Sequence, residues 1–515
     1  MGRRIRWLGV VLVLCFALVI VQLINIQFRQ ASALANSPDN PRIAATKYNN
    51  QRGLIMAADG TILAKSVKIN SSTSTYNYER EYPDGPLYAG ITGYDSIYFG
   101  TSGIEYQYNQ YLQTHAQPPQ NFSQLLFNKP PSEPDNVTLT VDPVLQAAAM
   151  KALETAPLAN RDGAVVVLNP TTGAVLALAS NPTFDPNGIA SPSVPTEEAD
   201  HFADLVPDSE KFSPLEPIAT ESSFPPGSTF KVITSTAVYN LKPSLSTYSF
   251  PPAASVIFPD SGGVPLKNDG GSACGGMMTI MLPQSCDPGY GALGVQLGVP
   301  TLTKQALDFG YALDGSKTPF VPGLDLPDVA PSVFSALQPD AQAFLAQSAI
   351  GQYNVRSTPL EGALVAAGIA NGGVIMTPHL MEKITNSQGA VVQTYKPTPM
   401  LTASTPAAAA AVTKLMVAVA NNTVPYATAN GIFPVSWHVA VKTGTAQVQA
   451  PVGPEQTDDW MIGFMPAEGA AQIAIAVVVP DQSFTGTGAG EAGPIVKQVF
   501  QAYLNETGDQ GGGQG

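Results

Sequence analysis

The stretch that decides the fold is Pro225-Pro-Gly-Ser-Thr-Phe-Lys231, in which a serine and a lysine stand three residues apart. If a helix begins at Ser228, Lys231 lies on the same helix face, and the preceding Pro-Pro-Gly suits a helix start. A serine hydroxyl is a poor nucleophile until a base takes its proton, and a desolvated lysine can be that base. S-x-x-K also arises by chance in chains of this length, but Lys231 is the only lysine here with a serine three residues before it.

A second stretch with chemical potential is Val441-Lys442-Thr443-Gly444-Thr445-Ala446, which follows Trp437-His-Val-Ala-Val and is typical of a strand end. A lysine and two hydroxyls on one strand edge can orient a carboxylate, and Gly444 lets a substrate backbone approach closely. Taken alone, the stretch is equally consistent with an exposed strand that ends in a surface lysine.

Composition limits the alternatives. The chain has 515 residues, of which 44% are hydrophobic and 12% charged, and its formal net charge is −14. This length suggests about three structural units. The acidic balance excludes a nucleic-acid partner, since phosphate binding needs concentrated lysine and arginine. Three cysteines and four scattered histidines argue against a disulfide-dense scaffold and a zinc site.

The N-terminus indicates a membrane protein. Residues 7–28 carry no charge and follow Arg3, Arg4 and Arg6. Such a segment is long enough to span a bilayer with its N-terminal flank in the cytoplasm, residues 1–6, and the rest of the chain on the outer face. A cleaved signal peptide, with a site at Ala33-Leu34-Ala35, is the alternative.

Local patterns predict an α/β domain whose sheet joins distant segments. Strands are expected at residues 137–142, 439–443, 460–464 and 473–479 and a hairpin at 163–179, while helices are expected at 143–153, 341–371 and 405–421. Residues 51–135 indicate an irregular β-containing module that ends in a linker, and the Gly-rich residues 507–515 are expected to be disordered.

S-x-x-K followed some two hundred residues later by K-T-G is the signature of penicillin-binding proteins and serine β-lactamases. The chain resembles a class B penicillin-binding protein, most closely the actinobacterial type that serves elongation or cell shape. Further stretches that resemble this family are Arg52-Gly53 with Asp59-Gly60, Gly103-Ile104-Glu105, Thr138–Gln146, Ala349–Gln352, Thr358-Pro-Leu, Gly372–Pro378 and Trp460–Phe464.

The resemblance implies an α/β (α+β) penicillin-binding transpeptidase fold, with a mainly antiparallel sheet flanked by helices. It also implies a non-catalytic, dimerisation-like pedestal at residues 29–135, ahead of a transpeptidase domain at residues 136–506.

The chain departs from the family at its third motif. The family carries S-x-N, which is absent here, and Gln284-Ser285-Cys286-Asp287-Pro288 stands at the expected place. Asn both donates and accepts hydrogen bonds, whereas an ionised Asp only accepts. A carboxylate there would raise the pKa of Lys231 and weaken it as a base. Alternatively, Asp287 pairs with Lys231 or stays protonated in a poorly solvated cleft.

By position, the resemblance makes Ser228 the acylated nucleophile and Lys231 its general base. Ser285 would relay a proton to the leaving amine, with Lys442 nearby, while Asp287, Thr443, Gly444 and Thr445 would bind substrate. The hydroxyls of Thr443 and Thr445 would hold the terminal carboxylate of the donor peptide. The N–H groups of Ser228 and Thr445 would form an oxyanion hole.

The implied function is peptidoglycan D,D-transpeptidation of D-Ala-D-Ala stem peptides in cell-wall synthesis and shape maintenance, with penicillin and other β-lactams as ligands and no metal or cofactor. The alternative is a β-lactam sensor or a low-activity scaffold, for which Asp287 is the argument. Glycosyltransferase motifs are missing, so the family resemblance suggests a SEDS-type membrane glycosyltransferase as partner.

The cysteines leave one question open. Cys15 falls in the expected membrane span, whereas Cys274 and Cys286 lie twelve residues apart in a compartment that permits disulfides. A bridge would tether Ser285 and Asp287 to the Gly270–Gly276 turn. Otherwise Cys286 is the small middle residue of its motif and Cys274 a free loop thiol.

Overall fold

The computed structural model describes residues 2–25, 48–70, 76–114, 133–159, 161–190, 202–206, 212–421, 423–424, 426–448, 455–483 and 485–508. The cleavage site considered at Ala35, residues 128–132 of the expected linker and residues 509–515 of the expected tail lie outside these ranges.

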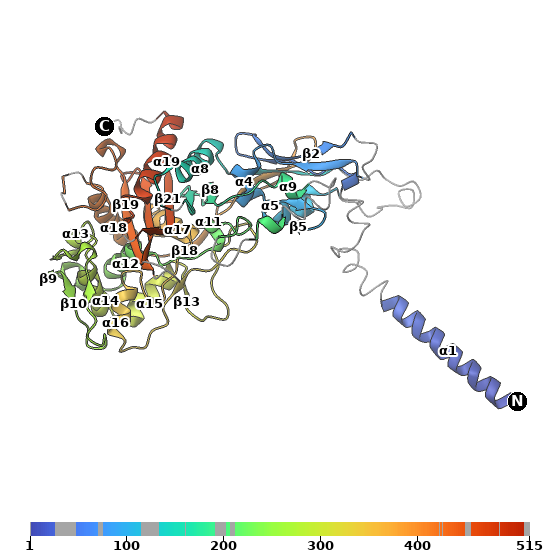
Figure 1. Cartoon of the computed structure of the whole chain (residues 1–515), viewed down its shortest axis with the longest axis horizontal. Coiled ribbons are helices and arrows are strands. Elements are labelled where there is room, and N and C mark those ends of the chain that lie inside the picture. The colour runs from blue at the N-terminus through green and yellow to red at the C-terminus, as the bar shows by residue number, and fades with distance from the viewer. Residues whose placement is uncertain are drawn as a thin grey trace.

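A five-stranded sheet in the order β19-β20-β21-β7-β8 forms the centre of the larger lobe (Figure 1). Its strands are β7 (Gly163–Leu168), β8 (Val175–Asn181), β19 (Ala440–Val448), β20 (Gln456–Met465) and β21 (Ile473–Ser483). Every pairing in it is antiparallel. Because β21 pairs with β7, the two ends of the domain close one sheet, as the sequence predicts.

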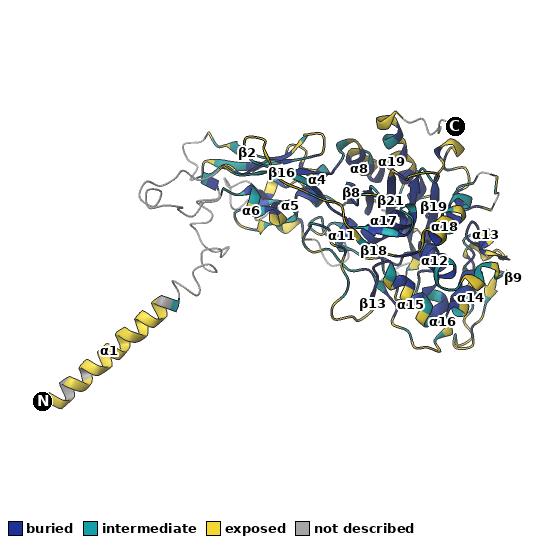
Figure 2. Ribbon diagram, turned by 180° about the vertical axis from the view of Figure 1, so that it is seen from behind, coloured by how far each residue is buried: buried dark blue, intermediate teal, exposed yellow. Residues whose placement is uncertain are grey.

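Helices cover both faces of this sheet. On one face, α17 (Pro359–Ala370) packs where Gly362 meets Trp460 and Ile462. On the other, Gly493 of α19 (Ala492–Thr507) lies beside Met461, and α8 (Pro143–Thr155) packs beside α19. Neighbouring residues of a strand point to opposite faces, so these contacts place α17 and α19 on opposite sides. Figure 2 shows α17 and the strands beneath it as buried.

The helix expected over 341–371 is wrong as a single element. It is divided into α16 (Gln342–Ser348) and α17, with a loop between them. Gly351 in that loop has a φ of 77°, and a Cβ there would stand 2.1 Å from the carbonyl oxygen of Gly227. The break therefore brings the backbone of residue 351 against the segment that carries Ser228.

A smaller lobe is built on a six-stranded sheet in the order β17-β16-β6-β1-β2-β3. Its strands are β1 (Ile55–Met56), β2 (Ile62–Lys68), β3 (Tyr78–Glu81), β6 (Asn136–Leu139), β16 (Met381–Thr385) and β17 (Val391–Thr394). Strands β1 and β6 are parallel and the other pairs antiparallel. The expected β-containing module thus exists, and its sheet also takes in strands from much later in the chain.

Shorter elements complete the described chain. The remaining helices and 3-10 turns are α4 (Gly85–Thr92), α5 (Gly103–Gln107), α6 (Asn109–Leu112), α9 (Asn187–Ala190), α11 (Ile218–Glu221), η2 (Gly227–Phe230), α12 (Lys231–Leu241), η3 (Pro243–Thr247), η4 (Asp269–Gly271), α13 (Met278–Met281), α14 (Asp287–Leu297), α15 (Val299–Asp308), α18 (Pro406–Val419) and η5 (Val435–Trp437). The remaining strands are β4 (Asp95–Ser96), β5 (Gly100–Thr101), β9 (Phe250–Ala253), β10 (Ser255–Val256), β11 (Leu266–Lys267), β12 (Cys274–Gly276), β13 (Ala312–Leu313), β14 (Val333–Phe334), β15 (Val374–Met376) and β18 (Pro399–Thr402).

The N-terminal helix α1 covers Gly2–Ile24, so the expected span of residues 7–28 begins inside it and ends beyond the described residues. None of the helices in the described part of the chain has both the length and the apolar composition needed to cross a membrane. The expected membrane span is therefore not confirmed.

Candidate active site

Ser228 lies on η2, the short 3-10 turn that leads into α12. The expected helix start is thus one 3-10 turn followed by an α-helix that begins at Lys231. Gly227 has a φ of 52°, in the left-handed region that suits glycine, and its N–H donates to the carbonyl of Gly351 at 3.0 Å. The indole N–H of Trp460 in turn donates to the carbonyl of Pro225 at 3.0 Å. These contacts hold the turn that carries Ser228 against β20 and the loop before α17.

Lys231 is fully buried and makes three polar contacts through its amine. Nζ lies 2.7 Å from Asp287 Oδ1, 2.6 Å from the carbonyl oxygen of Ser285 and 3.2 Å from Ser285 Oγ. These contacts match the three donors of an ammonium group. Burial lowers the pKa of Lys231, and the carboxylate of Asp287 raises it, with the net result below its ordinary value. Of the alternatives open for Asp287, the structure supports the ion pair.

Ser285 and Asp287 are presented by the turn between α13 and α14. Ser285 has a φ of 54°, an uncommon conformation for a residue with a side chain that is found at functional sites. Asp287 begins α14, where the helix dipole favours negative charge. Cys286 between them forms a disulfide with Cys274 of β12, with Cα atoms 5.6 Å apart. The disulfide, left open by the sequence, is therefore present and tethers this turn.

Lys442 reaches the same serine from the sheet edge. Its Nζ lies 2.9 Å from Ser285 Oγ and donates to the carbonyl of Thr443 at 2.7 Å. Burial lowers the pKa of Lys442 well below its usual range, and the positive charge of Lys231 lowers it further. Ser285 Oγ thus stands between one amine that is paired with a carboxylate and a second amine whose pKa is held well below its usual range.

The residues of β19 after Lys442 are held by contacts with three other segments of the chain. The hydroxyls of Thr443 and Thr428 lie 2.8 Å apart, and Thr445 Oγ1 accepts from the N–H of Gly488 at 3.1 Å. A Cβ on Gly444 would stand 2.7 Å from the carbonyl oxygen of Pro226. The sequence predicts that Gly444 lets a substrate backbone approach, whereas the close contact in the structure is with Pro226, in the segment that carries Ser228.

All eight residues expected to form the site, which are Ser228, Lys231, Ser285, Asp287, Lys442, Thr443, Gly444 and Thr445, lie on η2, α12, the α13–α14 turn and β19. The sequence did not predict Asn268, whose Oδ1 accepts from the N–H of Asp287 at 3.1 Å. Nor did it predict Tyr290, whose ring centre lies 5.6 Å from Lys231 Nζ. Neither residue belongs to a local motif, so no sequence signal marked them.

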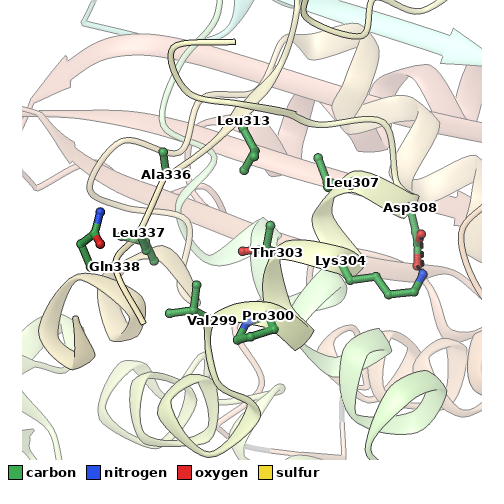
Figure 3. A pocket seen from close by; sticks show the side chains of 10 residues that line it. All are labelled: Val299, Pro300, Thr303, Lys304, Leu307, Asp308, Leu313, Ala336, Leu337 and Gln338. Carbon is green, nitrogen blue, oxygen red and sulfur yellow. Dashed lines mark hydrogen bonds and ion pairs between the residues drawn. The ribbon is translucent and has the colours of Figure 1, made fainter. Parts of the chain in front are cut away.

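A pocket of about 480 Å³ lies apart from these residues, along α15 and the segment at Ala336–Gln338 (Figure 3). Lys304 and Asp308 at its edge form an ion pair at 2.6 Å. No candidate catalytic residue lines it, so it is not part of the site.

Comparisons with known proteins show the family to which the chain is related. The model of the penicillin-binding protein transpeptidase domain matches residues 163–501, and that of the penicillin-binding protein A dimerisation domain matches residues 52–132. Among curated proteins, the peptidoglycan D,D-transpeptidase PbpA of Mycolicibacterium smegmatis is 34% identical over 98% of this chain and 100% of its own length. The PbpA of Mycobacterium tuberculosis is 32% identical over 95% of this chain and 96% of its own length.

Solved structures give the same result. The ceftriaxone acyl-enzyme complex of penicillin-binding protein A from M. tuberculosis is 30% identical, with a TM-score of 0.77, and covers 89% of this chain and 100% of that one. The penicillin G acyl-enzyme complex of the same protein is 31% identical, with a TM-score of 0.75, over 88% of this chain and 100% of that one.

Proposed function

The chain belongs to the class B penicillin-binding proteins of the actinobacterial type, and from this premise we propose that it carries out peptidoglycan D,D-transpeptidation through an acyl-enzyme on Ser228. It is a serine-type transpeptidase of cell-wall synthesis that binds penicillin. We assign roles to Lys231, Ser285 and Lys442 from one observation: Ser285 Oγ lies 3.2 Å from Lys231 Nζ and 2.9 Å from Lys442 Nζ.

Acylation needs an unprotonated amine beside Ser228, whereas Lys231 rests in an ion pair with Asp287. A hydroxyl can accept one proton while it donates its own, so Ser285 can pass a proton from Lys231 to Lys442 whenever the Lys442 amine is unprotonated, a form that burial favours by lowering its pKa. Lys231 then takes the Ser228 proton as Oγ attacks the penultimate D-Ala carbonyl. The proton returns through Ser285 to the leaving D-Ala amine, and an ester on Ser228 remains.

The charge that develops on the carbonyl oxygen needs donors in place before the reaction. The N–H groups of Ser228 and Thr445 are suited to this role because their backbones are close: a Cβ on Gly227 would stand 2.9 Å from the Thr445 carbonyl oxygen. The hydroxyls of Thr443 and Thr445 on the same strand would hold the terminal carboxylate of the donor peptide. An amine of a second stem peptide then resolves the ester.

A β-lactam sensor or low-activity scaffold is the second candidate, and the Lys231–Asp287 ion pair favours it because it stabilises the charged lysine. The two candidates differ in turnover. A transpeptidase releases D-Ala and transfers the acyl group to an amine, whereas a sensor stays acylated by a β-lactam and shows no transfer.

The test is intact-protein mass spectrometry of the full chain in detergent after incubation with benzylpenicillin. The wild type and Ser223→Ala, a matched control at a neighbouring exposed serine, should gain one penicilloyl group, and Ser228→Ala should gain none. A mass increase retained in Ser228→Ala would refute the assignment. A second assay follows transfer from a D-Ala-D-Ala pentapeptide to a D-amino acid, and its absence in an acylable protein would favour the sensor.

Membrane attachment belongs to the same proposal. The described side chains of α1 from residue 9 to residue 23 are exposed, and most of them are apolar, so they are free to contact lipid. We place residues 7–28 in the cell membrane, residues 1–6 in the cytoplasm and the transpeptidase domain, residues 136–506, on the outer face. We also propose a SEDS-type membrane glycosyltransferase as partner. Fractionation of cells that express the full chain and a variant lacking residues 2–28 tests the anchor, since only the full chain should sediment with membranes.

A further inference from the structure

A buried carboxylate, that of Asp459, lies beside the K-T-G-T segment on the neighbouring strand β20. In the antiparallel pairing of β19 with β20, Asp459 is the cross-strand partner of Thr445, so both side chains lie on one face of the sheet. Asp459 is fully buried. Its Oδ2 accepts from the hydroxyl of Thr457 at 3.1 Å, and its Oδ1 has no hydrogen-bond partner among the described residues.

The Thr445 hydroxyl has one proton to direct. Its oxygen already accepts from the N–H of Gly488 at 3.1 Å, so its own proton is left to donate, and Asp459 lies close enough to be one acceptor of that proton. Two acceptors compete for that proton. One is the carboxylate of Asp459 on the neighbouring strand, and the other is the terminal carboxylate of a bound substrate. A side chain at Gly488 would collide with the carbonyls of Gly444 and Trp460, so the backbone is packed closely here.

We propose that Asp459 is a positioning residue that sets the direction of the Thr445 hydroxyl and thereby the preference of the site for a carboxylate-bearing substrate. An ionised Asp459 accepts the Thr445 proton and turns the hydroxyl away from the substrate. A protonated Asp459 needs no such donor and leaves Thr445 free to donate forward. The inference rests on the proposed function, because it assigns Thr445 to the substrate carboxylate.

The pKa of Asp459 is near neutral pH, within the range over which acylation rates can be compared. Burial raises the pKa of Asp459 to about 7, hydrogen bonds from Thr457 and Thr445 oppose the rise, and the negative charges of Glu491 and Asp269 add to it. The protonated form therefore predominates below pH 7 and the ionised form above it. The preference for a carboxylate should accordingly fall as the pH rises through 7.

The test compares acylation of Ser228 by benzylpenicillin and by its methyl ester, which lacks the carboxylate, between pH 5.5 and 8.5. The quantity of interest is the ratio of the two second-order acylation rates. In the wild type, this ratio should fall about tenfold across the range, the effect of one hydrogen bond to a charged group. Burial also lowers the pKa of Lys231 and of Lys442, and their protonation affects acylation, so the wild type alone does not isolate Asp459.

Three variants separate the contribution of Asp459 to the pH dependence from that of the lysines. Asp459→Asn keeps the shape of the side chain without a titratable group, so the fall in the ratio should disappear. Thr445→Val should remove it as well, and it serves as a second route if Asp459→Asn does not fold. The matched control is Asp458→Asn: Asp458 is also buried, and its pKa is also raised to about 7 by burial. Its Oδ1 accepts from the N–H of Asp481, and it lies on the opposite face of β20, so its variant should keep the wild-type fall.

An unchanged pH dependence in Asp459→Asn, or its loss in Asp458→Asn as well, would overturn the inference while leaving acylation intact. Absence of any adduct on Ser228 in the wild type would instead refute the proposed function and the inference with it. The two failures are distinguished by the mass of the wild-type protein.

Discussion

Lys231 Nζ lies 2.7 Å from Asp287 Oδ1, with the lysine side chain fully buried and that of Asp287 16% exposed. The family motif places a neutral amide where this carboxylate stands, so the site has gained a counter-charge for Lys231, the residue that we propose as the general base. Burial disfavours the ammonium form of Lys231 and Asp287 favours it, and burial has the larger effect. The site is thus poised between a base that can be deprotonated and an ion pair that holds the proton.

Asp287→Asn should accelerate acylation. It removes the charge that raises the pKa of Lys231, so the pKa falls further and more of the amine is unprotonated at neutral pH. The rising limb of the acylation rate against pH should move to lower pH, with a gain of about three- to tenfold at pH 7, because one pKa unit corresponds to tenfold.

Stopped-flow acylation by a chromogenic cephalosporin measures this. Asp269→Asn is the matched control: Asp269 is exposed and also raises the pKa of Lys231, but less than Asp287 does, so its variant should shift the limb less in the same direction. Slower acylation by Asp287→Asn at neutral pH would mean that the carboxylate itself takes part in the reaction.

Loss of the disulfide should affect both stability and acylation. The bond joins Cys274 to Cys286, and Cys286 lies between Ser285 and Asp287. Closing a loop of this length stabilises a fold by about 3 kcal/mol, so Cys274→Ser should lower the free energy of unfolding by about that amount. It should also slow acylation, because the relay serine loses its tether. Urea unfolding and acylation rates measure the two effects.

Cys15→Ser is the control, because Cys15 is a free cysteine outside both lobes, and it should change neither quantity. Wild-type stability and acylation in Cys274→Ser would show that packing alone holds the α13–α14 turn.

Glu105 should be the most costly acidic residue to neutralise in the smaller lobe. Its oxygens accept from Arg52 Nε at 2.5 Å and from Arg80 Nε at 2.6 Å, and all three side chains are buried. Glu105→Gln leaves two buried guanidinium groups with too little counter-charge, which costs about 3–5 kcal/mol. Glu81→Gln is the matched control, since its ion pair with Lys65 is exposed and should contribute less than about 1 kcal/mol.

The ion pairs of Glu105 with Arg52 and Arg80 also predict that the stability of the protein falls in acid. Burial raises the pKa of Glu105, but the two arginines lower it by more, and the net pKa is below its ordinary value of 4.5. A carboxylate with a lowered pKa contributes stability above its unfolded pKa, and that stability is lost as the pH falls through the folded value. Urea midpoints between pH 6 and pH 3 should therefore fall more in the wild type than in Glu105→Gln. Parallel curves would contradict this.

Sequence motifs predicted the buried ion pair of the smaller lobe and the candidate site well, because they mark residues that meet in space. Arg52 and Glu105 were singled out 53 residues apart, and they form one ion pair. Lys231, Ser285 and Lys442 came from three separate motifs, and the amines of both lysines lie within 3.2 Å of Ser285 Oγ. Apolar runs also identified β7, β8, β19, β20 and β21, because these strands are buried over most of their length.

Features that depend on tertiary contact were beyond local patterns. The loop at Gly351 interrupts an alanine-rich stretch because the backbone must pass beside Gly227, a requirement that helix periodicity does not encode. The pairing of β16 with β6 adds a late segment to the early sheet. Asp459 directly precedes the strand expected at residues 460–464 and belongs to no motif, and only the register with Thr445 gives it a role.

The last prediction concerns Glu361, a buried acid of the core. Glu361 in the first turn of α17 is fully buried, and neither carboxyl oxygen has a hydrogen-bond partner among the described residues. Burial raises its pKa from 4.5 to about 8, so the folded protein holds it protonated at neutral pH while the unfolded chain releases the proton. The folded state then binds more protons than the unfolded state, and stability must fall as the pH rises from about 4.5 to about 8, by about 1.4 kcal/mol per pH unit at most. Glu361→Gln should remove this slope, so that its urea midpoint exceeds that of the wild type by more at pH 8 than at pH 5.5. Glu382→Gln, at an exposed carboxylate, should keep the wild-type slope, and an identical slope in Glu361→Gln would show that Glu361 is ionised in the folded protein.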